Sequence, residues 1–239
     1  MPRQTDTGFP RRKCLCVDLP LTAYLDAWTL QTDLVAARWE KRFHKDIILL
    51  LEHPPVFTLG RRGSSDNLIV SEEALKAKGI PVIQVERGGD ITYHGPGQLV
   101  VYPVMDLTAA RIGVADYVAM LEEVIIRTAG DWGINAERNP INRGVWAGRC
   151  KLASIGIAVR RGISFHGAAL NVNLSMKPFG WINPCGLRDI GMTSMKKELG
   201  RNVSMQEVRH SIRHHIKEIF RIDLIPAKIG DLALNTEVN

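Results

Sequence analysis

Two residues have the chemistry of a nucleophile and its activating partner. Cys185 lies between Pro184 and Gly186, a context typical of a bend that presents a side chain instead of burying it in a strand. A thiol with a pKa of about 8.5 is only a few per cent ionised at neutral pH, and an ammonium within about 4–6 Å lowers an acid's pKa by roughly 1–3 units. Lys151, just before the apolar run LASIGIAV, is the candidate for that ammonium. A structural cysteine and a surface lysine are the ordinary alternatives, and the two residues alone leave them open.

A segment rich in glycine and proline supplies further polar groups. It reads RGGDITYHGPGQ and follows the apolar run at 80–85. Its glycines and prolines indicate unusual dihedrals or close approach of the backbone to a ligand, although a tight turn between two strands has the same composition. Their spacing fits neither GxGxxG nor GxxxxGKS/T, so neither phosphate-binding loop is present. The side chains able to donate, accept or titrate are Arg87, Asp90, Thr92, Tyr93, His94 and Gln98.

The other cysteines and histidines indicate structure more than metal binding. Cys14 and Cys16 form a C-x-C pair, and strand alternation points both to one face as small apolar side chains. His210 and His214 have the i, i+4 spacing of two metal ligands on a predicted helix. No carboxylate motif accompanies them, so a solvated helix face is the favoured interpretation and we predict no metal site.

Composition limits the class of protein. The chain has 239 residues, 45% hydrophobic and 23% charged, which is ordinary for a globular protein with a buried core. Its longest apolar run, at 47–51, is too short to span a membrane, and no leader-like apolar segment is visible, so we expect a cytoplasmic protein. The formal charge of +6 and the pI near 9.3 predict an anionic partner, either an acidic protein or nucleic acid, but no nucleic-acid-binding motif occurs.

Hydrophobic periodicity predicts both helices and strands. Helices are expected at 22–45, 71–78, 116–132 and 204–220, the last opened by a capping box of Ser204 with Glu207. Strands are expected at 14–19, 46–53, 80–87, 98–107, 144–148, 151–159 and 165–174. They cluster as hairpins more than as βαβ units, so the expected fold is α/β (α+β), with a mixed, largely antiparallel sheet packed by helices. The expected organisation is a disordered tail at 1–13, one catalytic domain at 14–230 and a second tail at 231–239.

Together the motifs resemble one enzyme family. RGGDITYHGPGQ, the GVW…K-x-A-S-I-G run, FHGAALNVN and INPCG are similar, in this order, to the lipoyl(octanoyl) transferases of lipoate biosynthesis, over about 46–186. The resemblance implies a catalytic core like that of the biotin and lipoate protein ligases. It also implies transfer of an octanoyl group from the phosphopantetheine thioester of acyl carrier protein to a lysine of a lipoyl domain, through a thioester acyl-enzyme.

The resemblance also implies roles for individual residues. Cys185 matches the cysteine that carries the acyl group, and Lys151 matches the lysine that lowers its pKa. The positions that match segments lining the acyl site are Arg87, Gly88, Gly89, Asp90, Ile91, Thr92, Tyr93, His94, Ser154, Ile155, Gly156, Gly167, Ala168 and Ala169. Their glycines and alanines are expected to leave room for the acyl chain, and amides at 152–156 or at Gly186 are expected to stabilise the oxyanion. For His94 a substrate-steering or proton-relay role and a structural hydrogen bond stay open.

The implied partners are octanoyl-acyl carrier protein as donor, and the lipoyl domains of 2-oxoacid dehydrogenases and the glycine cleavage H protein as acceptors. No nucleic acid and no membrane are expected as partners. Because exchange between thioesters is nearly isoenergetic, we expect no ATP and no cofactor. Two alternatives stay open: an ATP-dependent ligase of the same fold that uses Lys151 and leaves Cys185 idle, and a basic scaffold or nucleic-acid-binding module supported only by the pI.

Overall fold

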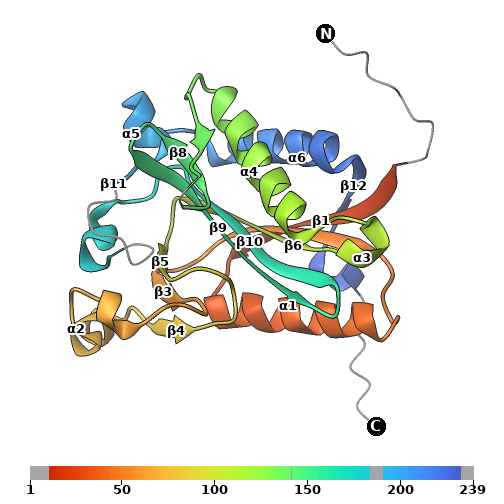
Figure 1. Ribbon diagram of the computed structural model, residues 1–239, viewed down its shortest axis with the longest axis horizontal. Coiled ribbons are helices and arrows are strands. Elements are labelled where there is room, and N and C mark those ends of the chain that lie inside the picture. Colours follow the sequence, from red (N-terminus) through yellow and green to blue (C-terminus); the bar gives the residue numbers. More distant parts are fainter. Residues whose placement is uncertain (1–10, 141, 184–190, 233–239) are drawn as a thin grey trace.

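A mixed sheet of nine described strands forms the centre of the molecule (Figure 1). The computed structural model describes residues 11–140, 142–183 and 191–232. The strand order is β12-β1-β2-β6-β10-β9-β8-β7, and β11 pairs with β9 outside this order. β1 is parallel to β12 and β2, and β11 is parallel to β9, whereas the other neighbours are antiparallel, which confirms the predicted sheet. The strands span Arg12–Leu21 (β1), Asp46–Glu52 (β2), Gln98–Val104 (β6), Glu137–Arg138 (β7), Val145–Ala147 (β8), Cys150–Arg160 (β9), Ile163–Asn171 (β10), Gly191–Met192 (β11) and Ile222–Ala227 (β12).

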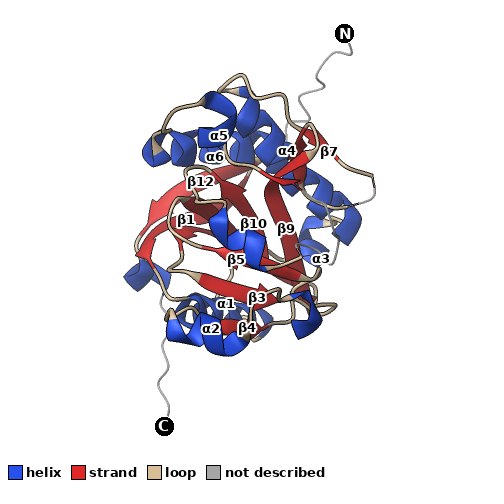
Figure 2. Cartoon of the chain, turned by 90° about the vertical axis from the view of Figure 1, so that its left-hand side faces the viewer, coloured by secondary structure: helices blue, strands red, loops and turns tan. Residues whose placement is uncertain are grey.

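Helices cover both faces of this sheet, with α4 and α6 on one face and α1 on the other (Figure 1, Figure 2). Strand alternation supplies the two cores: Ile48 of β2 packs on the α4 and α6 side, and its neighbour Leu49 packs on the α1 side. Cys14 and Cys16 are both buried on the α4 and α6 side, as the alternation predicted. The helices span Tyr24–Trp39 (α1), Glu72–Ala77 (α2), Leu107–Ala110 (α3), Val114–Gly130 (α4), Met195–Leu199 (α5) and Met205–Phe220 (α6). None of the helices in the described ranges is long and apolar enough to cross a bilayer.

A second, three-stranded sheet lies beside the main one and carries much of the glycine-rich segment. Its order is β4-β3-β5, with β3 between a parallel and an antiparallel neighbour. Phe57, Tyr93 and Phe179 form the centre of its apolar core. The bounds here are Val56–Leu59 (β3), Val82–Gln84 (β4) and Ile91–His94 (β5), with 3-10 turns at Ser65–Asn67 and Lys177–Trp181; a further 3-10 turn spans Ile229–Leu232.

Several elements differ from the sequence-based expectation, and three of these differences follow. α1 ends at Trp39, well before the predicted end at residue 45, and Lys41 has a φ of 58°, a left-handed conformation that a continuing helix excludes. β1 begins at Arg12, so Arg12 and Lys13 lie in a strand paired with β12, although their charge placed them in the N-terminal tail. The glycine-rich segment is not only a connection between two strands, because β5 lies within it and pairs with β3.

Candidate functional site

A cavity lies between the main sheet and the loop at 87–90 together with β5. Its empty volume, the open mouth included, is about 490 Å³. The main sheet contributes β6, β9 and β10 to its wall, and the small sheet contributes β5. The predicted site residues around it are Arg87, Gly88, Gly89, Asp90, Ile91, Thr92, His94, Lys151, Ser154, Ile155, Gly156, Gly167, Ala168 and Ala169. The fold therefore brings the segment at 87–94 together with the β9–β10 hairpin, which is remote from it in sequence.

Tyr93 is the predicted residue in the described ranges that does not line the cavity. Alternation along β5 turns its side chain away from Thr92 and His94. Its ring packs instead on Phe57 and Phe179, at centroid distances of 5.1 and 5.8 Å. We conclude that Tyr93 supports the small sheet.

Lys151 is buried at the start of β9, and its side chain lines the cavity. Its Nζ donates to Asn142 Oδ1 at 2.7 Å and lies 5.6 Å from the centroid of the Trp146 ring. Gly144 has a φ of +128°, and a Cβ there would lie 2.5 Å from Lys151 Cε. The β8–β9 hairpin thus holds the ammonium in one position, and only glycine fits at residue 144.

Cys185 and Gly186, two predicted participants, lie outside the described residues. The chain on either side of them is fixed. Asn183 N donates to Asn67 O at 2.8 Å, and Gly191 pairs with Cys150, directly beside Lys151. Cys185 precedes Gly191 by six residues, which span at most about 20 Å. The juxtaposition of the thiol with Lys151 stays a prediction.

A buried hydrogen-bond network supports the cavity loop. Arg87 Nη2 donates to both Thr58 O (2.7 Å) and Thr58 Oγ1 (2.8 Å). Thr58 Oγ1 lies 3.4 Å from His94 Nε2. Because the hydroxyl oxygen accepts from Arg87, its proton is available to His94 Nε2. The guanidinium at the cavity wall is therefore engaged by the protein itself.

The network continues from His94 toward the end of β9 that carries Lys151. His94 Nδ1 lies 2.7 Å from Gln98 Oε1, and Gln98 Nε2 donates to Asn171 Oδ1 at 2.9 Å. Asn171 Nδ2 in turn donates to Thr193 O, and Thr193 N donates to Lys151 O. Burial holds the pKa of His94 well below its usual value, and the nearby His53 and Arg87 lower it further. These hydrogen bonds favour the structural interpretation of His94, with a neutral ring.

Three comparisons with known proteins bear on this site. A family model described as the lipoyl protein ligase A/B catalytic domain matches residues 23–217. An octanoyltransferase of Desulfotalea psychrophila is 47% identical over 206 residues, covering 85% of this chain and 92% of the relative. One from Bacteroides fragilis is 40% identical over 209 residues, covering 84% and 95%. The chain belongs to the lipoyl protein ligase A/B catalytic-domain family. Within that family, the resemblance to the octanoyltransferases is confirmed.

Solved structures with a similar fold confirm the predicted fold class. A lipoate-protein ligase A bound with ATP superposes with a TM-score of 0.70 at 18% identity, and the match covers 94% of this chain and 93% of the ligase chain. LipL1 of P. falciparum in complex with lipoate gives 0.69 at 11% identity, covering 93% and 67%. A biotin protein ligase from Aquifex aeolicus gives 0.52 at 11% identity, covering 88% and 70%. At these identities the likeness concerns the fold alone.

Two glycines that line the cavity also allow neighbouring segments to approach closely. A Cβ at Gly167 would lie 2.1 Å from Val101 O, because β10 and β6 run close together there. A Cβ at Gly156 would lie 3.0 Å from both Gly88 O and Arg87 Cδ. These glycines therefore have a steric reason of their own, and the expectation that they also leave room for an acyl chain stays a prediction. The small side chains of Ala168 and Ala169 are a better source of space in the cavity.

Three further residues line the cavity but were not predicted from the sequence. They are Tyr24 of α1, Tyr102 of β6 and His166 of β10. Tyr102 Oη lies 2.9 Å from His53 Nε2, and burial lowers the pKa of His53 to about 4. His166 is buried with a φ of 57°, and burial lowers its pKa although Glu86, at 3.7 Å, opposes the shift. The one available signal was a polar residue in an otherwise apolar strand, as in VVYPV and FHGAAL.

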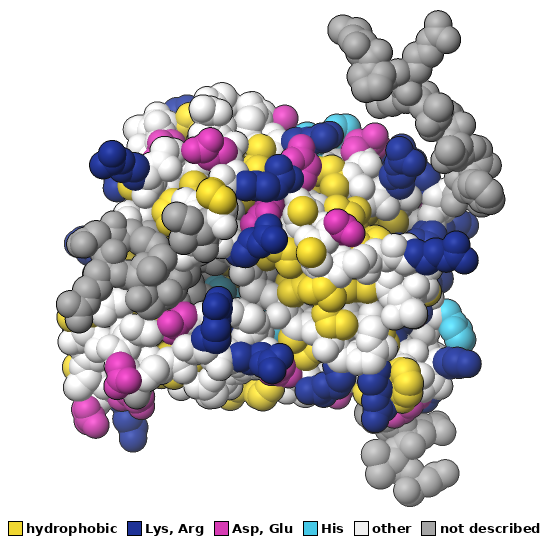
Figure 3. Space-filling view, in the orientation of Figure 1, with side chains coloured by type: hydrophobic (Ala, Val, Ile, Leu, Met, Phe, Trp, Pro, Cys, Tyr) yellow, Lys and Arg dark blue, Asp and Glu magenta, His cyan; other side chains and the backbone are white. Residues whose placement is uncertain are grey.

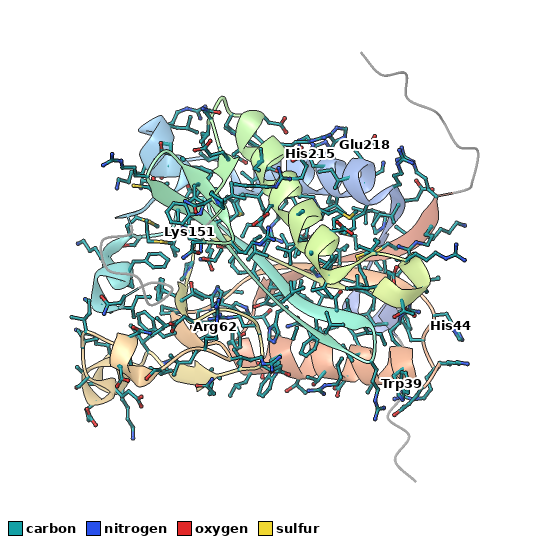
Figure 4. All side chains as sticks on the ribbon, viewed as in Figure 1. Trp39, His44, Arg62, Lys151, His215 and Glu218 are labelled. Atoms are coloured by element: carbon teal, nitrogen blue, oxygen red, sulfur yellow. The ribbon has the colours of Figure 1, made fainter. Side chains whose placement is uncertain are left out.

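The described residues contain no group of three or more His, Cys, Asp or Glu side chains arranged to hold a metal ion. His210 and His214 are exposed on α6, as the solvated-face interpretation predicted. Their neighbour His215 is buried, and its Nε2 lies 2.9 Å from Asp131 Oδ2. That pair joins α6 to the end of α4, and Figure 4 labels His215 beside these two helices.

Proposed function

We propose that this protein is an octanoyltransferase that moves an octanoyl group from acyl carrier protein to a lysine of lipoyl domains, including those of 2-oxoacid dehydrogenases and the glycine cleavage H protein. The observation that supports it most is the single cavity lined by Lys151 and by three segments that match the family's acyl site. The catalytic unit in this proposal is the one domain expected at 14–230, extended to Arg12 by β1, and its compartment is the cytoplasm.

The first half of the proposed reaction transfers the acyl group to Cys185. Its thiolate attacks the carbonyl carbon of the donor thioester, a new C–S bond forms, and the bond to the carrier sulfur breaks. The departing carrier thiolate takes a proton from the Lys151 ammonium, leaving that amine neutral. Asn142 Oδ1 accepts a hydrogen bond from Nζ throughout and keeps the amine in position.

The second half transfers the acyl group to the acceptor lysine. The neutral acceptor amine attacks the Cys185 thioester, an amide bond forms, and Cys185 leaves as a thiolate. Lys151 takes the proton that the acceptor amine loses, so its ammonium and the thiolate are both restored. No step consumes ATP, because each half exchanges one acyl linkage for another of equal or lower energy.

The backbone of β9 supplies a candidate donor for the oxyanion. Ile157 O accepts from Gly88 N at 2.8 Å, so Ile157 directs its backbone polar groups toward the cavity loop and away from β10. In an antiparallel pair the same direction recurs at every second residue, which assigns it to Ile155 as well. We therefore propose the Ile155 N–H, at the cavity wall, as an oxyanion donor.

The cavity supports binding of the acyl chain through apolar burial. Each buried CH₂ contributes roughly 0.8 kcal/mol, hence several kcal/mol for an eight-carbon chain. Ile155, Ala168 and Ala169 present apolar surface, while the polar groups of the wall are largely engaged with one another. Chain length in this proposal is limited by the depth of the cavity.

Intact-protein mass spectrometry after incubation with octanoyl-acyl carrier protein tests the acyl-enzyme. One added octanoyl group that hydroxylamine removes is expected for the wild type and for Cys150→Ser, a matched control because Cys150 is a partly exposed thiol beside Lys151. The Cys185→Ser variant should form no thioester-labile adduct, and such an adduct in that variant would reject the assignment. Iodoacetamide should abolish transfer, whereas an ATP-dependent ligase that uses free octanoate would survive the treatment.

A further inference from the structure

Two exposed arginines stand on a turn that is fixed to the cavity loop. Arg61 and Arg62 follow β3 after Gly60, and both side chains are exposed. Their backbone amides donate to Arg87 O at 2.9 Å and to Gly89 O at 3.1 Å. Any displacement of this turn would therefore break hydrogen bonds to residues that line the cavity.

Close packing against the cavity loop fixes the position of the turn. A Cβ at Gly60 would lie 2.5 Å from Gly89 O and 2.9 Å from Arg87 O. A Cβ at Gly63 would lie 3.1 Å from Gly60 N and Gly60 O. Glycine at both positions lets the turn press against the loop, so the two arginines are carried at a fixed place on the cavity rim.

Within the described residues, no carboxylate neutralises the charge of these arginines. Neither guanidinium has a carboxylate within ion-pair distance in the described part of the chain, in contrast to Arg38 and Arg209. Asp90, a carboxylate that lines the cavity, is already engaged: Oδ1 accepts from Ile91 N and Oδ2 accepts from Asn67 Nδ2.

The figures place this charge beside the cavity opening. Lys and Arg side chains border the hollow on the face shown in Figure 3. Figure 4 labels Lys151 above Arg62 on the left-hand side of the molecule. Arg62 therefore lies on the same side of this view as Lys151, and its turn is hydrogen-bonded to the loop that lines the cavity.

We propose that Arg61 and Arg62 bind the phosphate of the donor's carrier arm while its acyl thioester lies in the cavity. The inference rests on the proposed function, in which the donor is a thioester on a phosphopantetheine arm. A guanidinium fork matches the oxygens of a phosphate diester and stays charged at every working pH. Because the arm between phosphate and sulfur is long and flexible, a cation at the rim holds the donor without touching the reacting atoms.

Three octanoyl donors separate phosphate recognition from the other roles. Octanoyl-pantetheine has the arm without phosphate, octanoyl-4′-phosphopantetheine adds the phosphate, and octanoyl-acyl carrier protein adds the protein. For Arg62→Gln, kcat/KM should fall about fivefold with the two phosphorylated donors, the effect of losing an exposed ion pair, and stay within about twofold with octanoyl-pantetheine. The double variant Arg61→Gln with Arg62→Gln should lose more kcat/KM with the phosphorylated donors. Arg62→Lys should lose less than Arg62→Gln, because it keeps the positive charge. Arg111→Gln, an exposed arginine after α3, is the control and should change none of the three.

Each other outcome overturns the proposal in a recognisable way. An equal loss with all three donors would mean that the turn only supports the cavity loop. A loss confined to the whole carrier protein would mean that the arginines contact its surface and not the phosphate. Calorimetry with 4′-phosphopantetheine measures the same contact without catalysis. The affinity should weaken in Arg62→Gln and stay unchanged in Arg111→Gln. If the wild type transfers octanoyl from none of the donors, the proposed function fails instead.

Discussion

The Gly144→Ala substitution tests how the β8–β9 hairpin positions Lys151. The new Cβ would lie 2.5 Å from Lys151 Cε and 2.6 Å from Ala153 O, at a φ of +128°. Backbone strain costs about 1–3 kcal/mol and overpacking about 1–3 kcal/mol, so unfolding should become easier by roughly 2–6 kcal/mol. Because backbone closes one side, the lysine side chain must move, and a shift of about 1 Å at a reacting group costs on the order of 100-fold in rate.

Gly148→Ala in the same hairpin is the matched control. Gly148 has a φ of +55°, and a Cβ there would meet no atom of a non-neighbouring residue within 4 Å. The substitution therefore adds strain of about 1 kcal/mol without a contact. The assay is octanoyl transfer to a lipoyl domain, with thermal unfolding recorded for both variants. The expected result is a large loss of kcat in Gly144→Ala alone. Equal activity and equal stability of the two variants would refute the claim that residue 144 fixes the lysine.

Three other predictions follow from the structure. Burial favours the neutral form of His53 in the folded state and lowers its pKa to about 4 from the ordinary 6.5. The neutral ring therefore contributes about 3 kcal/mol to the free energy of unfolding; this contribution is complete above pH 6.5 and is lost as the pH falls toward 4. Chemical denaturation between pH 6.5 and pH 4 should show the free energy of unfolding falling with pH in the wild type, and falling less steeply in His53→Gln. Tyr93→Phe should leave kcat/KM within about twofold, because the ring packs in the small sheet, and a tenfold loss would return Tyr93 to the site. Gly167→Ala should lower stability by about 3 kcal/mol, since its Cβ would lie 2.1 Å from Val101 O, and wild-type stability would contradict that distance.

Local signals in the sequence were sufficient for much of the fold. The capping box predicted the start of α6, where Ser204 Oγ accepts from Glu207 N at 3.3 Å. Alternation predicted that Cys14 and Cys16 share a buried face, and the apolar run at 46–53 predicted β2. Each of these features depends on neighbours along the chain, which is why periodicity detects them.

Contacts between remote segments were not predictable in the same way. Ile91–His94 forms a strand only because β3 offers an antiparallel edge, and the flanking glycines concealed it. Three different elements bring Tyr24, Tyr102 and His166 to the cavity. No spacing in the sequence predicts that these residues lie together. Residue 167 has no room for a Cβ because β6 lies beside it, and the sequence does not show which strand is its neighbour.

The rate at which iodoacetamide alkylates Cys185, followed on its own peptide by mass spectrometry across pH, tests the central claim most directly. The account predicts an apparent thiol pKa that is lower in the wild type than in Lys151→Gln by roughly 1–3 units, because the ammonium stabilises the thiolate. Identical pH profiles for the two proteins would contradict it.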